Sequence, residues 1–346
     1  MKHVFRFIVG IIILLLIFSY FYNKKQLSNE FVEARKAEYV DRYTTGEYML
    51  NIYRTGNKES NYKIIGISDF AENDFSVKSY FINEDLKDLY DLIYIDRAGY
   101  GLSEDTLSIQ TVENIVDDYR NALNRADIKG PYVLMAHGYG SVYATYWENK
   151  YPNEVSGVIY LDGTTLSEEN KAVSIDYKEY FKLIMNKLGL NRYFGETETV
   201  SVYYSPELVN FSKTMNLRSS STNARISEVN YMKTSMDETY NLIKENNIPK
   251  MYVTSSVFKS SEEYRDYFDW YNKRLDSQDK SIQEVPTDSQ ISKIVNDSKM
   301  FEIENVIPFT DLLGNTKIFE VVGPEKLFEE NHSDLSGLIK EFINSL

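Results

Sequence analysis

Cysteine is absent from the sequence, so the chain can form no disulfide and offers no thiolate to a metal ion or to a covalent reaction. Histidine is almost as scarce: the three copies, His3, His137 and His332, lie far apart, and we expect no metal site and no cofactor. Basic residues are outnumbered, with 38 Lys and Arg against 52 Asp and Glu and a formal net charge of −14. This balance argues against a nucleic-acid partner, because phosphates require a positive surface.

Long hydrophobic runs are missing except at the N-terminus, where residues 4–22 are almost wholly apolar. As a helix, these nineteen residues would be about 28 Å long, close to the thickness of a hydrocarbon core. A cleaved signal peptide is the alternative, but the end of the run, SYFYN, lacks the small-x-small pattern of a cleavage site. We therefore predict an uncleaved transmembrane anchor over residues 1–25, followed by a juxtamembrane helix or stalk over residues 26–44.

Basic residues on both sides of the apolar run give opposing indications of its orientation. Lys2 and Arg6 favour a cytoplasmic N-terminus, whereas the four basic residues between positions 24 and 36 favour the opposite. A short basic lead before a first apolar run is typical of a signal anchor. We expect a single-pass protein of the cell membrane, with its globular part outside the cytoplasm and the bilayer as a partner.

The remainder of the chain, residues 45–346, alternates between strand-like and helix-like segments and is long enough for one large domain with an insertion. Short apolar runs typical of strands lie at residues 48–54, 62–67, 91–95, 132–136, 155–161, 248–254 and 317–322. Strands separated by helical segments such as 111–125 predict a mostly parallel α/β sheet with helices on both faces. Residues 166–247 contain no strong strand, which predicts a helical cap inserted over the edge of the sheet.

One stretch organises the rest of the chain: the apolar run 132–136, a turn H-G-Y-G centred on Gly138, and a helix that ends before Pro152. Strand, sharp turn and helix in this order resemble the nucleophile elbow of the α/β-hydrolase family, where the turn reads G-x-S-x-G. The resemblance covers most of residues 45–346 and implies the α/β-hydrolase fold. Aligned on the turn, Gly138 stands where the family has its nucleophilic serine, and glycine has no side chain that could attack a carbonyl.

The same resemblance assigns the other two members of a catalytic triad. The family order of nucleophile, acid and histidine places His332 at the position of the general base, on the loop before the last helix. No aspartate follows the strand at 248–254, where the acid is expected, and Asp162 at the end of the preceding strand is the substitute. The alternative roles are an ordinary strand-end turn for Asp162 and a solvated loop for His332.

The oxyanion loop of the family normally begins with His-Gly, whereas here it reads Ser68-Asp69. An oxyanion hole is built from backbone N–H groups, so the amides of Phe70 and Tyr139 could still form one. Asp69 would place a carboxylate where negative charge has to develop, which opposes that chemistry. We expect Ser68, Asp69, Phe70 and Tyr139 to line the substrate pocket.

Two hypotheses for function follow. In the first, a membrane-anchored α/β-hydrolase-family protein lacks ordinary serine-hydrolase activity and binds a small-molecule ligand or a protein partner through the former pocket and cap. In the second, the protein hydrolyses a small ester or other acyl substrate with an atypical site around His332. Ser141, Ser103 and Ser68 are candidates for a relocated hydroxyl. We prefer the first hypothesis because glycine cannot supply a nucleophile.

Overall fold

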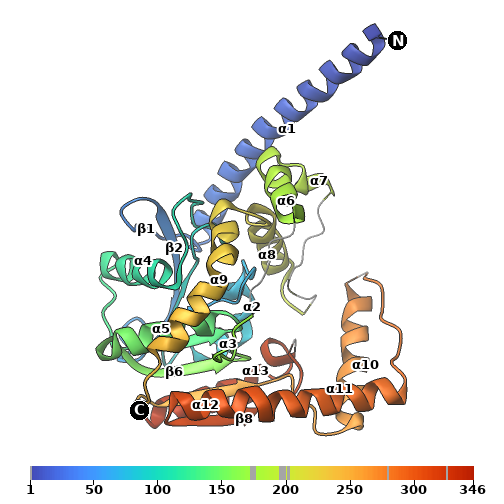
Figure 1. Cartoon of the computed structure of the whole chain (residues 1–346). Helices are drawn as coiled ribbons and strands as arrows, with labels where there is room; N and C mark the ends of the chain where they lie inside the picture. Colours follow the sequence, from blue (N-terminus) through green and yellow to red (C-terminus); the bar gives the residue numbers. More distant parts are fainter. Residues whose placement is uncertain (1, 172–176, 195–199, 201–202, 279, 325) are drawn as a thin grey trace.

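A single sheet lies at the centre of the protein (Figure 1). The computed structural model describes residues 2–171, 177–194, 200, 203–278, 280–324 and 326–346. The strands within these residues are β1 (Arg42–Thr44), β2 (Met49–Gly56), β3 (Lys63–Ile67), β4 (Asp91–Ile95), β5 (Tyr132–His137), β6 (Val155–Leu161), β7 (Lys250–Thr254) and β8 (Thr316–Glu320). Their spatial order is β1-β2-β4-β3-β5-β6-β7-β8. The pairs β1–β2 and β2–β4 are antiparallel and the others are parallel, which confirms the predicted mostly parallel sheet.

Helices cover both faces of this sheet. Those in the described residues are α1 (Lys2–Lys36), α2 (Phe75–Lys78), α3 (Tyr80–Leu86), α4 (Val112–Arg125), α5 (Gly140–Lys150), α6 (Tyr177–Leu188), α7 (Asn191–Phe194), α8 (Pro206–Arg218), α9 (Asn223–Leu242), α10 (Ser261–Ser277), α11 (Asp288–Phe301), α12 (Ile307–Leu313) and α13 (His332–Asn344). Shorter helical segments are η1 (Pro152–Glu154), η2 (Glu302–Val306) and η3 (Lys326–Phe328). Hydroxyl side chains begin several helices by accepting a hydrogen bond from the N–H three residues on, namely Thr111, Ser205, Thr222, Ser260 and Thr287.

The apolar residues of the parallel strands form two cores, one on each face of the sheet. One core includes Val116 of α4, Trp147 of α5 and Phe309 of α12. The other includes Ile82 of α3 and Ile339 of α13. Because both faces are covered, β4, β6 and β7 are buried along almost their whole length, which explains why their sequences are continuously apolar rather than alternating.

The cap lies between β6 and β7, where the described residues form α6, α7, α8 and α9 and no strand. Residues 172–176, 195–199 and 201–202 of the predicted cap lie outside the described residues. Figure 1 shows these helices between the sheet and the projecting N-terminal helix. A buried ion pair, with Arg97 Nε 3.3 Å from Glu228 Oε1, joins the loop after β4 to α9. This ion pair therefore fastens the cap, through α9, to the end of strand β4.

The segment predicted as a juxtamembrane helix or stalk is helical as far as Lys36 and then joins the sheet. Helix α1 continues without a break to Lys36, and β1 already pairs with β2 at Arg42–Thr44, so the sheet begins within residues 26–44. A three-residue polar strand is formed by pairing with its neighbour, which its own sequence pattern does not reveal. Helix α1 is long and apolar enough to cross a bilayer, and no other helix of the described residues has this property.

Candidate functional site

The turn between β5 and α5 has the geometry of a nucleophile elbow. Gly138 has a φ of +51°, a left-handed conformation that glycine adopts without the penalty of a Cβ atom. Its N–H donates to the Leu161 carbonyl at 3.0 Å, which ties the turn to the end of β6. A Cβ atom on Gly140 would lie 2.6 Å from the Ile67 carbonyl oxygen, so the second glycine allows the turn to approach the end of β3.

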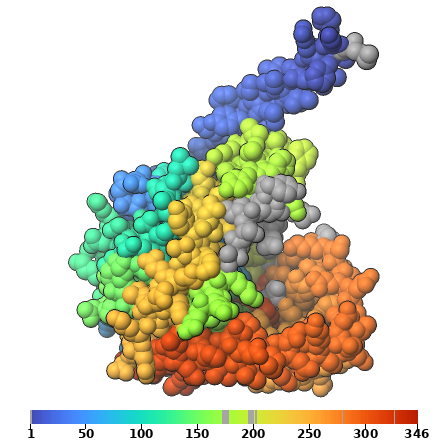
Figure 2. All heavy atoms as spheres, in the orientation of Figure 1, coloured from blue at the N-terminus to red at the C-terminus, as the bar shows by residue number. Residues whose placement is uncertain are grey.

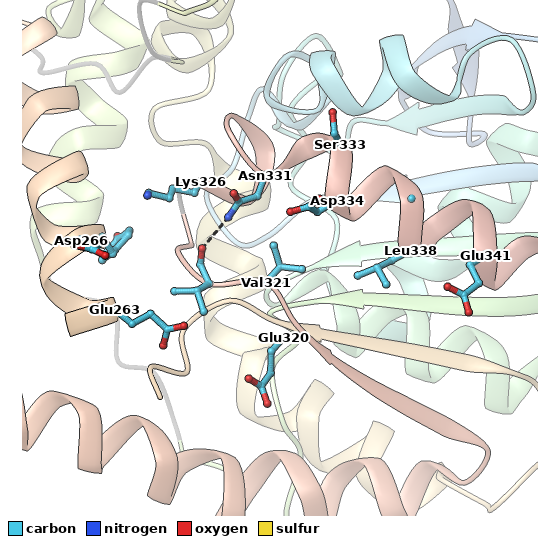
Figure 3. A pocket seen from close by; sticks show the side chains of 13 residues that line it. Glu263, Asp266, Glu320, Val321, Lys326, Asn331, Ser333, Asp334, Leu338 and Glu341 are labelled. Atoms are coloured by element: carbon cyan, nitrogen blue, oxygen red, sulfur yellow. Dashed lines mark hydrogen bonds between the residues drawn. The ribbon is translucent and has the colours of Figure 1, made fainter. Parts of the chain in front are cut away.

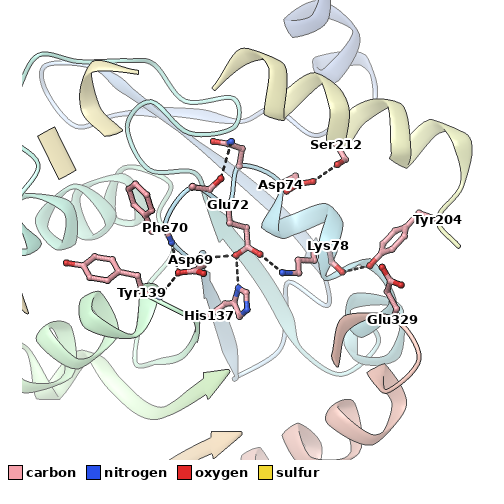
Figure 4. Close-up of polar contacts among 12 residues, drawn as sticks. Asp69, Phe70, Glu72, Asp74, Lys78, His137, Tyr139, Tyr204, Ser212 and Glu329 are labelled. Carbon is pink, nitrogen blue, oxygen red and sulfur yellow. Dashed lines mark hydrogen bonds and ion pairs between the residues drawn. The ribbon is translucent and has the colours of Figure 1, made fainter. Parts of the chain in front are cut away.

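The carboxylate of Asp69 occupies the space over Gly138 that the nucleophile side chain would take. Figure 4 shows this carboxylate in contact with Phe70 and Tyr139. A Cβ atom on Gly138 would lie 2.2 Å from Asp69 Cγ and 2.3 Å from Asp69 Oδ1. The same Oδ1 accepts hydrogen bonds from the backbone N–H groups of Phe70 and Tyr139, each at 2.6 Å. These are the two amides that the family resemblance assigned to an oxyanion hole. The carboxylate oxygen of Asp69 thus occupies the position that the oxyanion of a reaction intermediate would take.

Arg97, just after β4, holds the loop that carries Asp69. Its buried guanidinium donates to the Ser68 carbonyl at 2.8 Å, to Ser68 Oγ at 3.0 Å and to the Asp69 carbonyl at 2.8 Å. Burial lowers the pKa of Arg97, but the carboxylate of Glu228 outweighs burial, so the pKa stays well above the ordinary value. The guanidinium is therefore always charged. Its hydrogen bonds to the carbonyls of Ser68 and Asp69 hold the backbone of the loop, and with it the position of Asp69.

Glu72 is the hub of the polar contacts around the turn. Its Oε2 accepts a hydrogen bond from the Asp69 N–H at 2.9 Å and lies 2.9 Å from His137 Nδ1, while its Oε1 accepts from Lys78 Nζ at 2.8 Å. Burial alone would raise the pKa of Glu72, but the charges of His137 and Lys78 outweigh it and hold the pKa well below its usual range. Glu72 is thus an ionised carboxylate, and His137 hydrogen-bonds beneath the elbow while its ring stacks on Phe75.

A cavity of about 350 Å³ opens beside this network, lined by residues of the loop after β3, the cap and α10. Charged side chains of both signs line it: Asp69, Glu72, Asp74, Lys78, His137, Arg274, Lys280 and Glu329. Aromatic rings add apolar surface: Phe70, Tyr204, Tyr271 and Phe328. Burial raises the pKa of Asp74 to about 6, although the Ser212 hydroxyl donates to it and partly offsets this rise. Ligands of open α/β sheets usually bind at this position, outside the carboxyl ends of the strands.

The two remaining residues assigned to the triad have other partners. His332 is the first residue of α13; its Nδ1 lies 2.7 Å from Asp85 Oδ2 of α3, its ring stacks on Phe81, and it is not among the residues that line the cavity. Asp162 accepts hydrogen bonds from the Ser255 N–H at 2.7 Å and from the Ser255 hydroxyl, and so fastens the end of β6 to the end of β7. Within the part of the chain that the structure describes, no hydrogen bond joins His332 to Asp162.

The three hydroxyls considered as relocated nucleophiles are all engaged. Ser141 Oγ donates to the Thr164 carbonyl at 3.3 Å, and Ser103 Oγ donates to the Asp96 carbonyl at 2.6 Å. Ser68 Oγ accepts the hydrogen bond from the guanidinium described above. None of these contacts is with a histidine, so they supply no base of the kind that activates a serine.

A second hollow, of about 690 Å³, lies between α10, β8 and α13 (Figure 3). Its lining is mainly acidic, with one lysine: Glu263, Asp266, Glu320, Asp334, Glu341 and Lys326. No group of three His, Asp or Glu side chains within the described residues is arranged to hold a metal ion. None of its lining residues belongs to the elbow or to the loop after β3, so we assign the candidate site to the cavity beside Asp69.

Sequence reasoning named Asp69 but missed most of the charged residues around it. A signal existed for Glu72 and Asp74, because three carboxylates fall within residues 69–74, directly after a buried strand. No comparable signal exists for Arg274 and Glu329, which are 55 positions apart in sequence and meet at 3.0 Å only because α10 packs beside the loop before α13.

Comparison with known proteins agrees with this architecture. No family model matches the chain. The uncharacterised protein YbdG of Bacillus subtilis (strain 168) is 25% identical over 214 residues, which span 60% of this chain and 62% of YbdG. A thermophilic esterase from Thermogutta terrifontis has a similar structure, with a TM-score of 0.54, 14% identity, and coverage of 88% of this chain and 99% of the esterase. The epoxide hydrolase CorEH has a TM-score of 0.56 and 14% identity, with 88% of this chain and 98% of that one covered. Together with the sheet order and the elbow, these similarities establish that the chain has the α/β-hydrolase fold.

Proposed function

We propose that this chain is a membrane-anchored protein that does not hydrolyse substrates by an ordinary serine mechanism and instead binds a ligand or a partner through the cavity beside Asp69. The observation that supports this best is the double role of Asp69. Its carboxylate fills the space over Gly138 and accepts hydrogen bonds from the two backbone amides expected to form the oxyanion hole. The missing nucleophile and the occupied hole remove two independent contributions to catalysis. The paired charges and aromatic rings of the cavity suit a polar small molecule.

The wild-type chain is expected to remain unlabelled by serine-directed fluorophosphonate probes and to hydrolyse p-nitrophenyl esters no faster than buffer, because Gly138 has no hydroxyl and none of Ser141, Ser103 and Ser68 is hydrogen-bonded to a histidine. The measurement uses the full-length protein in detergent, with an active serine hydrolase in the same detergent as a positive control. Labelling that disappears in Ser141→Ala or in Ser68→Ala would reveal a relocated nucleophile and overturn the proposal.

The alternative, hydrolysis by an atypical site, has one observation in its favour. The carboxylate of Asp85 lies 2.7 Å from His332 Nδ1, and such a contact can orient an imidazole as a general base. Ester turnover by the wild type that is lost in His332→Ala and retained in Ser141→Ala would support this alternative over a binding protein.

Anchoring by α1 is the second part of the proposal. Large apolar side chains between residues 4 and 18 are exposed, as they would be in contact with lipid. The part of α1 that carries them projects from the body of the protein (Figure 1). We expect the full-length chain to stay in the membrane fraction after a carbonate wash, and deletion of residues 2–18 to release it. Because the lead before the apolar run is short and basic, we also expect protease added outside intact cells to reach the globular part. Protein in the supernatant that lacks its first residues would indicate a cleaved signal sequence instead.

A further inference from the structure

Exposed apolar side chains gather on the part of the cap that lies next to α1. This cap patch consists of Tyr180, Phe181 and Ile184 of α6 with Tyr193 and Phe194 of α7, and these side chains are between 48% and 77% exposed. On α6, Tyr180 and Phe181 both lie on the face of Ile184, because they precede it by four and three positions. Single exposed apolar residues are normal on a soluble surface, but five large ones on two consecutive helices, with the rings of Tyr193 and Phe194 in contact, indicate an interaction surface.

Polar contacts fix the height of the cap patch along α1. The Ser19 hydroxyl donates to the Leu188 carbonyl, at the end of α6, at 2.7 Å. The Asn23 side chain donates to the Asn186 carbonyl at 3.1 Å and accepts from Arg192 Nε of α7 at 2.6 Å. Figure 2 shows α6 and α7 lying directly against α1 where that helix leaves the body. The helices that carry the patch are therefore bound to α1 at Ser19 and Asn23.

This height coincides with the end of the apolar run. Ser19 is the first buried residue of α1, and residues 2–18 are exposed apart from the half-buried Gly10 and Leu16. If residues 4–22 cross the hydrocarbon core, which takes about 28 Å of helix, α1 enters the headgroup region between Ser19 and Asn23. Tyr20 and Tyr22 lie there, in the position of the aromatic side chains that mark membrane interfaces. A body docked at this height lies against the headgroups.

We propose that the cap patch inserts into the interfacial layer of the bilayer that α1 crosses, so that the cap is itself a membrane-binding element. This proposal rests on the proposed anchoring by α1. The local charge supports it: α6 carries three lysines against one glutamate, and Lys24 and Lys25 follow on α1, in a chain with a net charge of −14. Apolar side chains beside basic ones are the combination that binds a surface of anionic lipids.

The test places a fluorescent reporter on the patch. The full-length Phe194→Trp variant is reconstituted into vesicles of equal parts phosphatidylcholine and phosphatidylglycerol, with or without bromine atoms near the top of the acyl chains. The matched control is Val285→Trp, on the connection between α10 and α11, because Val285 is 72% exposed and Phe194 is 77% exposed. Emission of the wild type, which contains Trp147 and Trp270, is subtracted. We expect blue-shifted emission from position 194 and several-fold stronger quenching by bromine than at position 285.

The outcomes separate this proposal from anchoring alone. Equal quenching at positions 194 and 285, in protein that resists carbonate extraction, would overturn insertion of the cap and leave the anchor intact. Protection of position 194 from aqueous iodide without quenching by bromine would mean that a second copy of the chain covers the patch, which also overturns the proposal. Release of the protein by carbonate would refute the anchor, and the cap proposal with it.

Discussion

Gly138→Ser is expected to lower the free energy of unfolding by about 2–4 kcal/mol and to produce no active hydrolase. Part of this cost arises because Gly138 has a φ of +51°, where any Cβ atom is strained. The larger part arises because the new Cβ atom would lie 2.2 Å from Asp69 Cγ. Asp69 cannot move aside freely, since its Oδ1 holds two backbone amides and its carbonyl is held by Arg97.

A double-mutant cycle with Asp69→Ala tests this explanation. The Asp69→Ala substitution removes the three atoms that a Cβ atom at position 138 would meet first, so Gly138→Ser should cost much less in its presence. Asp74→Ala is the matched control, because Asp74 is a buried carboxylate of the same loop that does not contact Gly138. Denaturant unfolding of the wild type, both single variants and the double variant in detergent measures the coupling, and the same cycle with Asp74→Ala gives the control. An equal cost of Gly138→Ser in the wild type and in Asp69→Ala would show that Asp69 does not fill the position.

The double variant Gly138→Ser/Asp69→Ala also tests how much of a catalytic site survives. It restores the hydroxyl and frees the amides of Phe70 and Tyr139, so we expect weak labelling by fluorophosphonate where either single variant shows none. Adding His332→Ala then shows whether His332 assists. Since His332 pairs with Asp85 rather than with a residue of the cavity, we expect the labelling to persist.

The strands and long helices could be read from the sequence because burial on both faces, or on one helical face, leaves a strong pattern. The strands at 91–95 and 155–161 have the bounds that the pattern predicted, and the helix predicted at 111–125 begins one residue later. The sequence did not reveal β1 or the short helices α2 and α3, because three residues are too few to show the alternation of a strand, and four or seven are too few to show the 3.6-residue period of a helix. These segments are stabilised by contacts with other elements, such as the pairing of β1 with β2 and the packing of α3 against α13.

The backbone of the candidate site was more predictable than its side chains. The turn at Gly138 and the amides of Phe70 and Tyr139 follow from the order of strand, turn and helix, and the structure brings them together. One oxygen of Asp69 accepts hydrogen bonds from both amides only because the side chain adopts a particular rotamer, and no sequence pattern predicts that rotamer. The pairing of His332 with Asp85, 247 positions away, depends on the packing of α13 beside α3 and is equally hidden.

Arg97→Met is expected to lower the free energy of unfolding by about 3–5 kcal/mol, the usual cost of removing one partner of a buried ion pair. The side chains of Arg97 and Glu228 are 1% and 3% exposed, so the carboxylate of Glu228 would lose its counter-ion without gaining water. The hydroxyls of Tyr100 and Tyr143, which donate to it at 2.6 and 2.5 Å, would be its remaining partners. The loss is measured by denaturant unfolding in detergent.

The double variant Arg97→Met/Glu228→Met distinguishes the charge from the hydrogen bonds that Arg97 makes to the loop. Removing both charges should recover most of the loss, because apolar residues of similar volume can replace a buried ion pair. Recovery should remain incomplete, since the carbonyls of Ser68 and Asp69 still lack their donor. Arg265→Met is the matched control: Arg265 pairs with Asp288 at 2.7 Å, but both are exposed, and the expected cost is below about 1 kcal/mol. Equal losses of unfolding free energy for Arg97→Met and Arg265→Met would show that the buried ion pair does not fasten α9 to the loop that holds Asp69 over Gly138.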